Sequence, residues 1–160
     1  MRNFIEAKQF CEHITDGTHD SPHYIKKGYP LITSKYIMNG HIITENVPLI
    51  SKADFDQVNL RSKVKIGDVL FSMIGTVGEV AIVKQHPNFA IKNMGLFRCK
   101  NMLDANILYY YLQSSYAKQK NREFLSGSTQ QYITLSNLKT YPILDISTNN
   151  KQHIVNTLWY

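Results

Sequence analysis

The sequence predicts a single domain of mixed fold that is rich in short strands and contains one long helix. Two strand-forming runs, residues 69–74 and 79–84, flank the segment 75–78, and two such runs joined by four residues with two glycines are typical of a β-hairpin. Asn39-Gly40 indicates a second hairpin. The apolar residues of segment 105–125 recur at helical spacing, which predicts the long helix.

The N-terminal segment allows two interpretations. Residues 3–14 fit a helix through the spacing of Phe4, Ala7 and Phe10, but part of the same segment also fits a strand. The turn-forming residues 15–22 end this element, because they combine Gly, Pro and small polar side chains. A buried strand is then expected at 31–33.

Ser51 predicts the start of a short helix, since its hydroxyl can cap free backbone amides and Asp54 suits the positive end of the helix dipole. We expect this helix to end near Leu60. Residues 89–91 and 94–99 continue the strand-rich region beyond the hairpin.

Asp104 is expected to cap the long helix of residues 105–125, which Gly127-Ser128 ends. The elements expected after it are strands at 129–133 and 141–146, a turn between them at Ser136-Asn137, and a helix beginning near Asn149 or Asn150.

Composition narrows the class of protein. The 160 residues fit one globular domain, and 43% hydrophobic with 19% charged residues excludes a disordered tail. Eighteen lysines and arginines against twelve acidic residues give a net charge of +6, which favours a polyanionic partner such as nucleic acid. Glu6 lies where a signal peptide needs an apolar core, and no stretch is apolar enough to span a bilayer. Cys11 and Cys99 lack metal-ligand spacing, so a reduced, cytoplasmic chain is expected.

Three short patterns allow a catalytic or metal-binding interpretation, and each is incomplete. Segment 74–84 is similar to a kinase glycine-rich loop but lacks its leading glycine and the other kinase motifs. His19 and His23 are separated by Pro22, which excludes the helix that would present both to one metal ion. Glu6-Ala7-Lys8 fits the acid-x-lysine fragment of metal-dependent nucleases, but no acid precedes it. We therefore expect no catalytic centre.

Binding chemistry is the remaining signal. Ten tyrosines and seven phenylalanines accompany the basic residues, with Tyr24 close to Lys26 and Tyr36 next to Lys35. Lysine and arginine suit phosphates, and asparagine and glutamine can pair bidentately with adenine. Many of these tyrosines can equally be core or rim residues.

A series of motifs runs along nearly the whole chain. In order they are Asp16-Gly17-Thr18-His19 with Pro22, Pro30-Leu31-Ile32, Gly67-Asp68-Val69-Leu70-Phe71-Ser72, Ile74-Gly75-Thr76-Val77-Gly78, the Asn93 segment, Tyr109 to Gln113, Gly127-Ser128-Thr129-Gln130, and Gln152, Ile154, Val155 and Leu158. Each motif alone is unspecific. In this order the series resembles the target recognition domain of the DNA specificity (S) subunit of type I restriction-modification systems.

The resemblance implies an α+β, β-rich fold with strand-hairpin winding, one long helix and a truncated C-terminal helix. It implies a recognition domain over residues 1–148 and the start of a conserved spacer helix over 149–160. Such a domain reads one half-site of a split target in double-stranded DNA, as part of the defence against foreign DNA, and is not itself an enzyme. The implied partners are type I methyltransferase (modification) subunits and a restriction (translocase-nuclease) subunit. S-adenosylmethionine, ATP and Mg²⁺ belong to those partners, and no cofactor is expected in this chain.

Three departures from the family pattern stand out. Met73 occupies a position where arginine often follows the serine, so one basic contact is missing. Lys151 replaces a glutamate before Gln152. The sequence ends at Trp159-Tyr160, where the spacer helix should continue, so we expect a recognition domain without its spacer helices.

Motifs shared by domains with different targets cannot encode the target, so Asp16–His19, Gly67-Asp68 and 75–78 are assigned mainly to the scaffold. The predicted base-reading residues are Arg61, Asn93, Gln130 and Gln131, because arginine suits guanine and amides suit adenine. Predicted phosphate-binding residues are Lys26, Lys27, Lys63 and Lys84, and the remaining predicted DNA contacts are Lys35, Tyr36, Lys92 and Tyr132. Two other interpretations remain open: an interaction module without DNA affinity, and a fragment of a nucleic-acid-processing enzyme.

Overall fold

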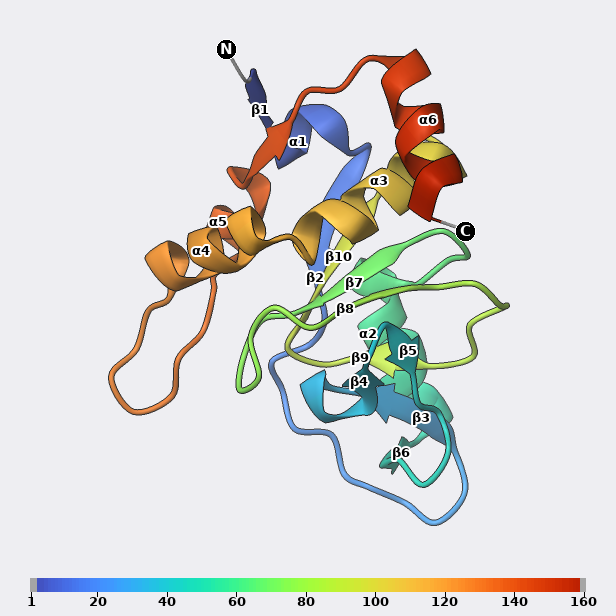
Figure 1. Ribbon diagram of the computed structural model, residues 1–160. Coiled ribbons are helices and arrows are strands. Elements are labelled where there is room, and N and C mark those ends of the chain that lie inside the picture. Colours follow the sequence, from blue (N-terminus) through green and yellow to red (C-terminus); the bar gives the residue numbers. More distant parts are fainter. Residues whose placement is uncertain (1–2, 159–160) are drawn as a thin grey trace.

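The computed structural model describes residues 3–158, and both helices and strands occur along this part of the chain (Figure 1). The helices are α1 (Ala7–Phe10), α2 (Lys52–Ser62), α3 (Met102–Leu112), α4 (Ser115–Phe124), α5 (Leu135–Lys139) and α6 (Thr148–Leu158), with a 3-10 turn η1 (Ser34–Tyr36). The strands are β1 (Phe4–Glu6), β2 (His13–Asp16), β3 (Tyr29–Ile32), β4 (Ile37–Met38), β5 (His41–Ile42), β6 (Leu49–Ile50), β7 (Val69–Ser72), β8 (Val80–Ile82), β9 (Ala90–Ile91), β10 (Met94–Arg98) and β11 (Pro142–Leu144).

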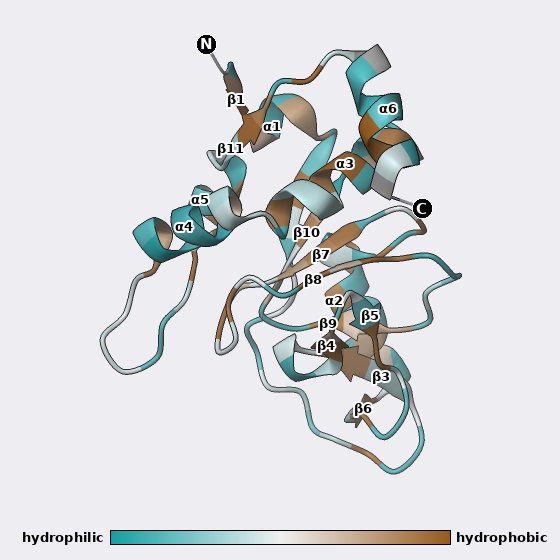
Figure 2. Ribbon diagram, viewed as in Figure 1, coloured by the Kyte–Doolittle hydropathy of each residue, from teal (hydrophilic) through white to brown (hydrophobic). Residues whose placement is uncertain are grey.

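A four-stranded antiparallel sheet with the order β2-β10-β7-β8 lies at the centre. Successive side chains of a strand point to opposite faces of the sheet. Phe71 and Phe97 face one core cluster, whereas Leu70 and Leu96 face a second cluster on the other side. Because both faces are covered, β7 is hydrophobic from Val69 to Phe71, as its brown colour shows in Figure 2, and Met94, Leu96 and Phe97 of β10 are buried.

The two faces are covered by different structures. Helices α3 to α6 lie on one side of the sheet, while the small sheet β6-β3-β9, the hairpin β4–β5 and α2 lie on the other (Figure 1). Strands β3 and β9 are parallel, and α2 packs on β9. None of the helices among the described residues is long and apolar enough to cross a membrane.

Strand β1, near the beginning of the described chain, pairs antiparallel with β11, which precedes the last helix α6. Next to this pair, the fully buried Tyr141 donates its hydroxyl proton toward the carbonyl oxygen of Ala117 and the side-chain oxygen of Asn121, each 2.7 Å away. Burial raises the pKa of Tyr141 above its ordinary value. Helix α6 packs on α3, where Lys151 forms an ion pair with Asp104 at 2.6 Å.

The predicted long helix is divided in two, which corrects the expectation for residues 105–125. Helix α3 ends at Leu112, and Ser114 starts α4 because its Oγ accepts a hydrogen bond from the backbone N–H of Ala117 at 3.2 Å. A serine that caps a new helix competes with continuation of the old one. The N-cap of α3 is Asn101 rather than Asp104, so that expectation was also wrong.

The segment after α4 also differs from the prediction. Within 129–133, Tyr132 makes isolated bridges to Ile74 and Ser126, and no continuous strand forms. The expected turn at Ser136-Asn137 lies inside α5, because Thr134 and Asn137 form a capping box. The expected strand at 141–146 is present as β11.

Other expectations are confirmed. Strands β7 and β8 pair as the predicted hairpin, and Asn39-Gly40 connects β4 to β5. Ser51 caps α2 by accepting a hydrogen bond from the backbone N–H of Asp54 at 3.0 Å. The mixed fold is confirmed as well, although more residues lie in helices than in strands. Met73 is buried in the core.

Candidate nucleic-acid interface

Four loops meet at one end of the central sheet, and main-chain hydrogen bonds join them. The backbone N–H of Asn93 donates to the carbonyl of Thr18 at 3.0 Å, Met73 donates to Asn93 at 3.3 Å, and Ile133 donates to Met73 at 2.9 Å. We call this end, formed by loops 17–23, 73–79, 92–93 and 125–134, the open end. Figure 1 shows loops 73–79 and 125–134 projecting on the same side of the sheet.

The β7–β8 loop is shaped by Ser72 and two glycines. Ser72 Oγ accepts a hydrogen bond from the backbone N–H of Glu79 at 2.8 Å and donates to the carbonyl of Thr76. Gly75 and Gly78 have φ angles of 80° and 94°, which glycine adopts without steric cost. The scaffold role predicted for this segment agrees with these bonds.

The neighbouring loop 125–134 carries three predicted contacts. Ser126 and Tyr132 exchange main-chain hydrogen bonds at 2.9 Å, which closes the loop. Gln130 and Gln131 are exposed at its tip, and the side chain of Tyr132 is half-exposed beside them.

A cluster of charged side chains occupies the other half of the open end. The carboxylate of Asp16 is 6% exposed and lies 2.7 Å from Nε2 of His19 and 3.0 Å from Nη2 of Arg61. The same guanidinium donates to the carbonyl oxygen of Gly17 at 2.7 Å. Arg61 therefore anchors this loop, and its side chain is still 57% exposed.

Asn93 and Lys92 connect this cluster to the rest of the open end. Asn93 has a left-handed backbone, with φ at 54°, and its Oδ1 lies 2.9 Å from Nδ1 of His19. Asparagine tolerates this conformation better than most residues. Lys92 Nζ donates to Oγ of Ser21 at 2.6 Å.

The structure thus brings six predicted DNA contacts to the open end, and they are Arg61, Lys92, Asn93, Gln130, Gln131 and Tyr132. Lys35 is exposed in η1, next to Ser34, which lies near Gly75 of the open end. Tyr36 is half-buried against the second core cluster.

The remaining predicted lysines lie elsewhere. Lys26 and Lys27 are exposed and lie near β6. They directly follow Ile25, whose backbone N–H donates a hydrogen bond to the carbonyl of Leu49 in β6. Lys63 is at the opposite end of the sheet, where its carbonyl accepts a hydrogen bond from Arg98. Lys84 follows β8 at that same end.

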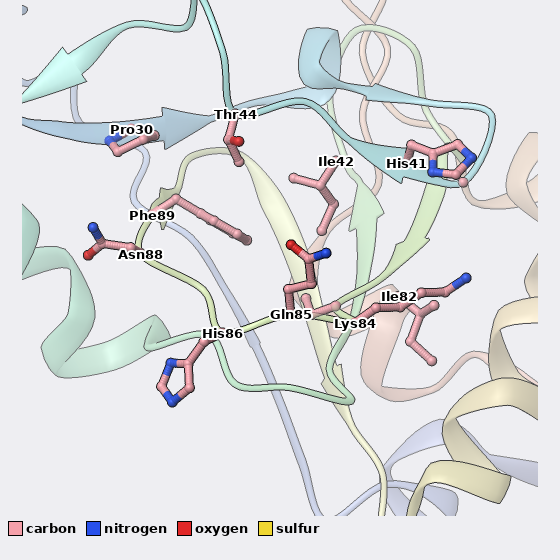
Figure 3. A pocket seen from close by; sticks show the side chains of 12 residues that line it. Pro30, His41, Ile42, Thr44, Ile82, Lys84, Gln85, His86, Asn88 and Phe89 are labelled. Atoms are coloured by element: carbon pink, nitrogen blue, oxygen red, sulfur yellow. The ribbon is translucent and has the colours of Figure 1, made fainter.

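A hollow of about 450 Å³ lies between the β4–β5 hairpin and the loop after β8 (Figure 3). Gln85 and Phe89 point into it, whereas His86 points away. Its lining includes Lys84 and belongs to the end of β8 remote from the open end. Among the described residues, no group of three or more His, Cys, Asp or Glu side chains could hold a metal ion.

The linkage of His19 to Asn93 was missed by sequence reasoning, which treated His19 as a scaffold residue. The two residues are 74 positions apart. The spacing of Asp16 and His19 is a usable local signal, since residues three apart in a turn can exchange a side-chain contact.

The model of the type I restriction modification DNA specificity domain matches residues 3–158. The chain therefore belongs to this family. No curated protein sequence matches it.

Solved structures show the same fold. The chain is similar to the type I restriction-modification S subunit from M. genitalium, with 17% identity and a TM-score of 0.65 over 99% of this chain and 38% of that one. It is similar to the HsdS subunit from Thermoanaerobacter tengcongensis, with 18% identity and a TM-score of 0.68 over 98% and 36%. A structure concerned with complex assembly and conformational transition of the type I R-M system gives 20% identity and a TM-score of 0.70 over 98% and 37%. The chain spans a little over a third of each.

Proposed function

We propose that this chain binds double-stranded DNA through the open end and reads one half-site of a split target for a type I restriction-modification system. The observation that carries the proposal is the family match over residues 3–158. The open end supports it, because cationic, amide and aromatic side chains gather on a loop framework. Lysine and arginine suit phosphates, and amides suit base edges.

In this proposal the chain is a recognition component and performs no catalysis. It assembles with methyltransferase (modification) subunits and a restriction subunit, which supply S-adenosylmethionine, ATP and Mg²⁺ chemistry. The carboxylate of Asp16 at the open end supports a binding role. It contacts His19 and Arg61, so it is not a free carboxylate of the kind that a catalytic site presents.

Titration of a fluorescent duplex of random sequence with the chain tests the proposal. We expect weak binding, with a Kd of about 10⁻⁴ to 10⁻⁶ M near physiological salt, that strengthens as the salt concentration falls. Salt-independent binding, or none at low salt, would reject the proposal. Affinity for a methyltransferase subunit without DNA affinity would then identify an interaction module, and metal-dependent cleavage of the duplex would identify an enzyme fragment.

Selection from a library of random duplexes tests the reading of bases. Gln131→Ala should change the preference at one position of the selected sites and leave the dependence on salt unaltered. The matched control is Gln152→Ala, since Gln152 is an exposed glutamine on α6. If Gln131→Ala weakens binding to all sequences alike, Gln131 is not a base-reading residue.

A further inference from the structure

Both ring nitrogens of His19 face oxygen atoms. Its Nε2 faces Oδ2 of Asp16 at 2.7 Å, and its Nδ1 faces Oδ1 of Asn93 at 2.9 Å. A carboxylate and an amide oxygen only accept hydrogen bonds. In this geometry Nδ1 donates its proton to the amide oxygen of Asn93, and Nε2 faces the carboxylate of Asp16.

The surroundings of the ring are charged on several elements. Asp16 of β2 contacts the ring directly, and Arg61 of α2 contacts the other oxygen of that carboxylate at 3.0 Å. Asp20 and Asp54 line, with His19, a neighbouring hollow of about 470 Å³. The direct neighbour of the ring is thus a carboxylate, and the guanidinium lies behind it.

Asn93 cannot leave this contact easily, because its backbone is held on both sides. Its N–H donates to Thr18 and its carbonyl accepts from Met73. With Oδ1 bonded to the ring, the amide nitrogen and its two protons are the part that remains for an external partner. If the ring loses the Nδ1 proton, Nδ1 becomes an acceptor and the amide must turn over to satisfy it.

We propose that His19 is a positioning residue that fixes the Asn93 amide with its N–H donors toward the DNA, so that Asn93 selects a base edge rich in acceptors. In the major groove this edge is that of guanine, with N7 and O6, rather than that of cytosine, whose N4 donates. The adenine pairing expected from sequence needs amide oxygen and nitrogen together, and His19 holds the oxygen. This inference rests on the proposed DNA binding.

The state of the ring is testable in the free chain by NMR of the histidine nitrogens. Nδ1 of His19 should carry a proton, and His19→Ala should change the Asn93 side-chain amide signals, because it removes the hydrogen bond to Oδ1. An unprotonated Nδ1, or an amide indifferent to His19→Ala, would overturn the inference. This measurement does not depend on DNA.

Selection from the random duplex library then tests the consequence for sequence. At about pH 6 the unaltered chain should favour guanine over cytosine at one position by about fivefold or more. Asn93→Asp, which replaces the donors by acceptors, should reverse this preference. His19→Ala should reduce it and leave the salt dependence unaltered, because the amide can then turn either way.

Asn46→Asp is the matched control, since Asn46 is also an asparagine with a left-handed backbone, in an exposed bend away from the open end. It should keep the original preference. If the Asn93→Asp chain binds the duplex with the same preference for guanine over cytosine, the inference is overturned and the proposed function stays in place. Absence of binding at low salt would reject the proposed function itself. If His19→Ala does not fold, the NMR measurement and Asn93→Asp still decide.

Discussion

The two ends of the central sheet each contain a buried aspartate beside a glycine, Asp16-Gly17 at the open end and Gly67-Asp68 at the other. The side chain of Asp68 is 1% exposed and accepts two hydrogen bonds from Arg98, at 2.6 and 2.8 Å, in addition to one from the backbone of Lys65. Arg98 is itself only 23% exposed. We call this the closed end.

At the open end the carboxylate is also buried, but its partners are not. The side chains of His19 and Arg61 are 53% and 57% exposed. The difference shows that a buried acid can either bury its cation or hold a cation at the surface. Exposure of the partner, rather than of the acid, separates the structural end from the end suited to binding.

The largest expected effect is on stability at the closed end. Asp68→Ala should lower the free energy of unfolding by about 3–5 kcal/mol, because it leaves the partly buried guanidinium of Arg98 without its carboxylate. Asp16→Ala should cost about 1–3 kcal/mol, since His19 and Arg61 can turn to water. Urea denaturation measures both, and equal losses would remove the distinction between the ends.

For the glycines beside the two aspartates, Gly17 and Gly67, the larger loss of stability is expected at the open end. A Cβ on Gly17 would lie against the carbonyl of Ile91, only 2.5 Å from its carbon, so Gly17→Ala should lower the free energy of unfolding by about 3 kcal/mol. Gly67 has open space, with Met102 Cε at 3.6 Å, and a φ of 87°. Gly67→Ala should therefore cost about 1–2 kcal/mol from the left-handed backbone alone. A larger loss for Gly67→Ala in thermal or urea unfolding would contradict this.

Two lysines extend the comparison to DNA. Lys92→Ala should weaken binding to all sequences and reduce the slope of log K against log salt by about 0.9, the effect of one lost phosphate contact. Lys63→Ala should reduce the slope less, because Lys63 lies at the closed end. Equal reductions in parallel salt titrations would mean that the duplex contacts both ends.

The smallest effect concerns the thiols near the closed end. The side-chain hydrogen bond with Cys11, together with burial, raises the pKa of the Cys99 thiol. Since the thiolate is the reactive form, the folded chain should react slowly with iodoacetamide at about pH 8, and the chain unfolded in urea should react faster. Rapid alkylation of the folded chain would show that this end opens readily.

Local signals were sufficient for much of the fold. The β7–β8 and β4–β5 hairpins follow from glycine and asparagine in their turns, and the start of α2 follows from Ser51. The division between α3 and α4 was missed. Ser114 has helical segments on both sides, and a serine in that position can either continue one helix or cap the next. The capping box of Thr134 and Asn137 is a local signal of the same kind.

The candidate site was predicted in its residue types but not in its arrangement. Asp16, Arg61 and Asn93 come from three distant segments, and the register of β2 against β10 places Asp16 opposite Gly95 beside them. A single sequence contains no direct signal for that register. The same limitation applies to Lys63 and Arg61, which are two positions apart and yet lie toward opposite ends of the sheet.

The main-chain bonds that link Thr18, Asn93, Met73 and Ile133 have a consequence for evolvability. Peptide groups are chemically alike in every residue except proline, so these bonds do not depend on which side chains the loops carry. Substitutions at exposed positions such as Gln130 and Gln131 therefore leave the framework in place. A lineage under pressure to change what this surface recognises can do so by single replacements, without having to refold the domain at each step.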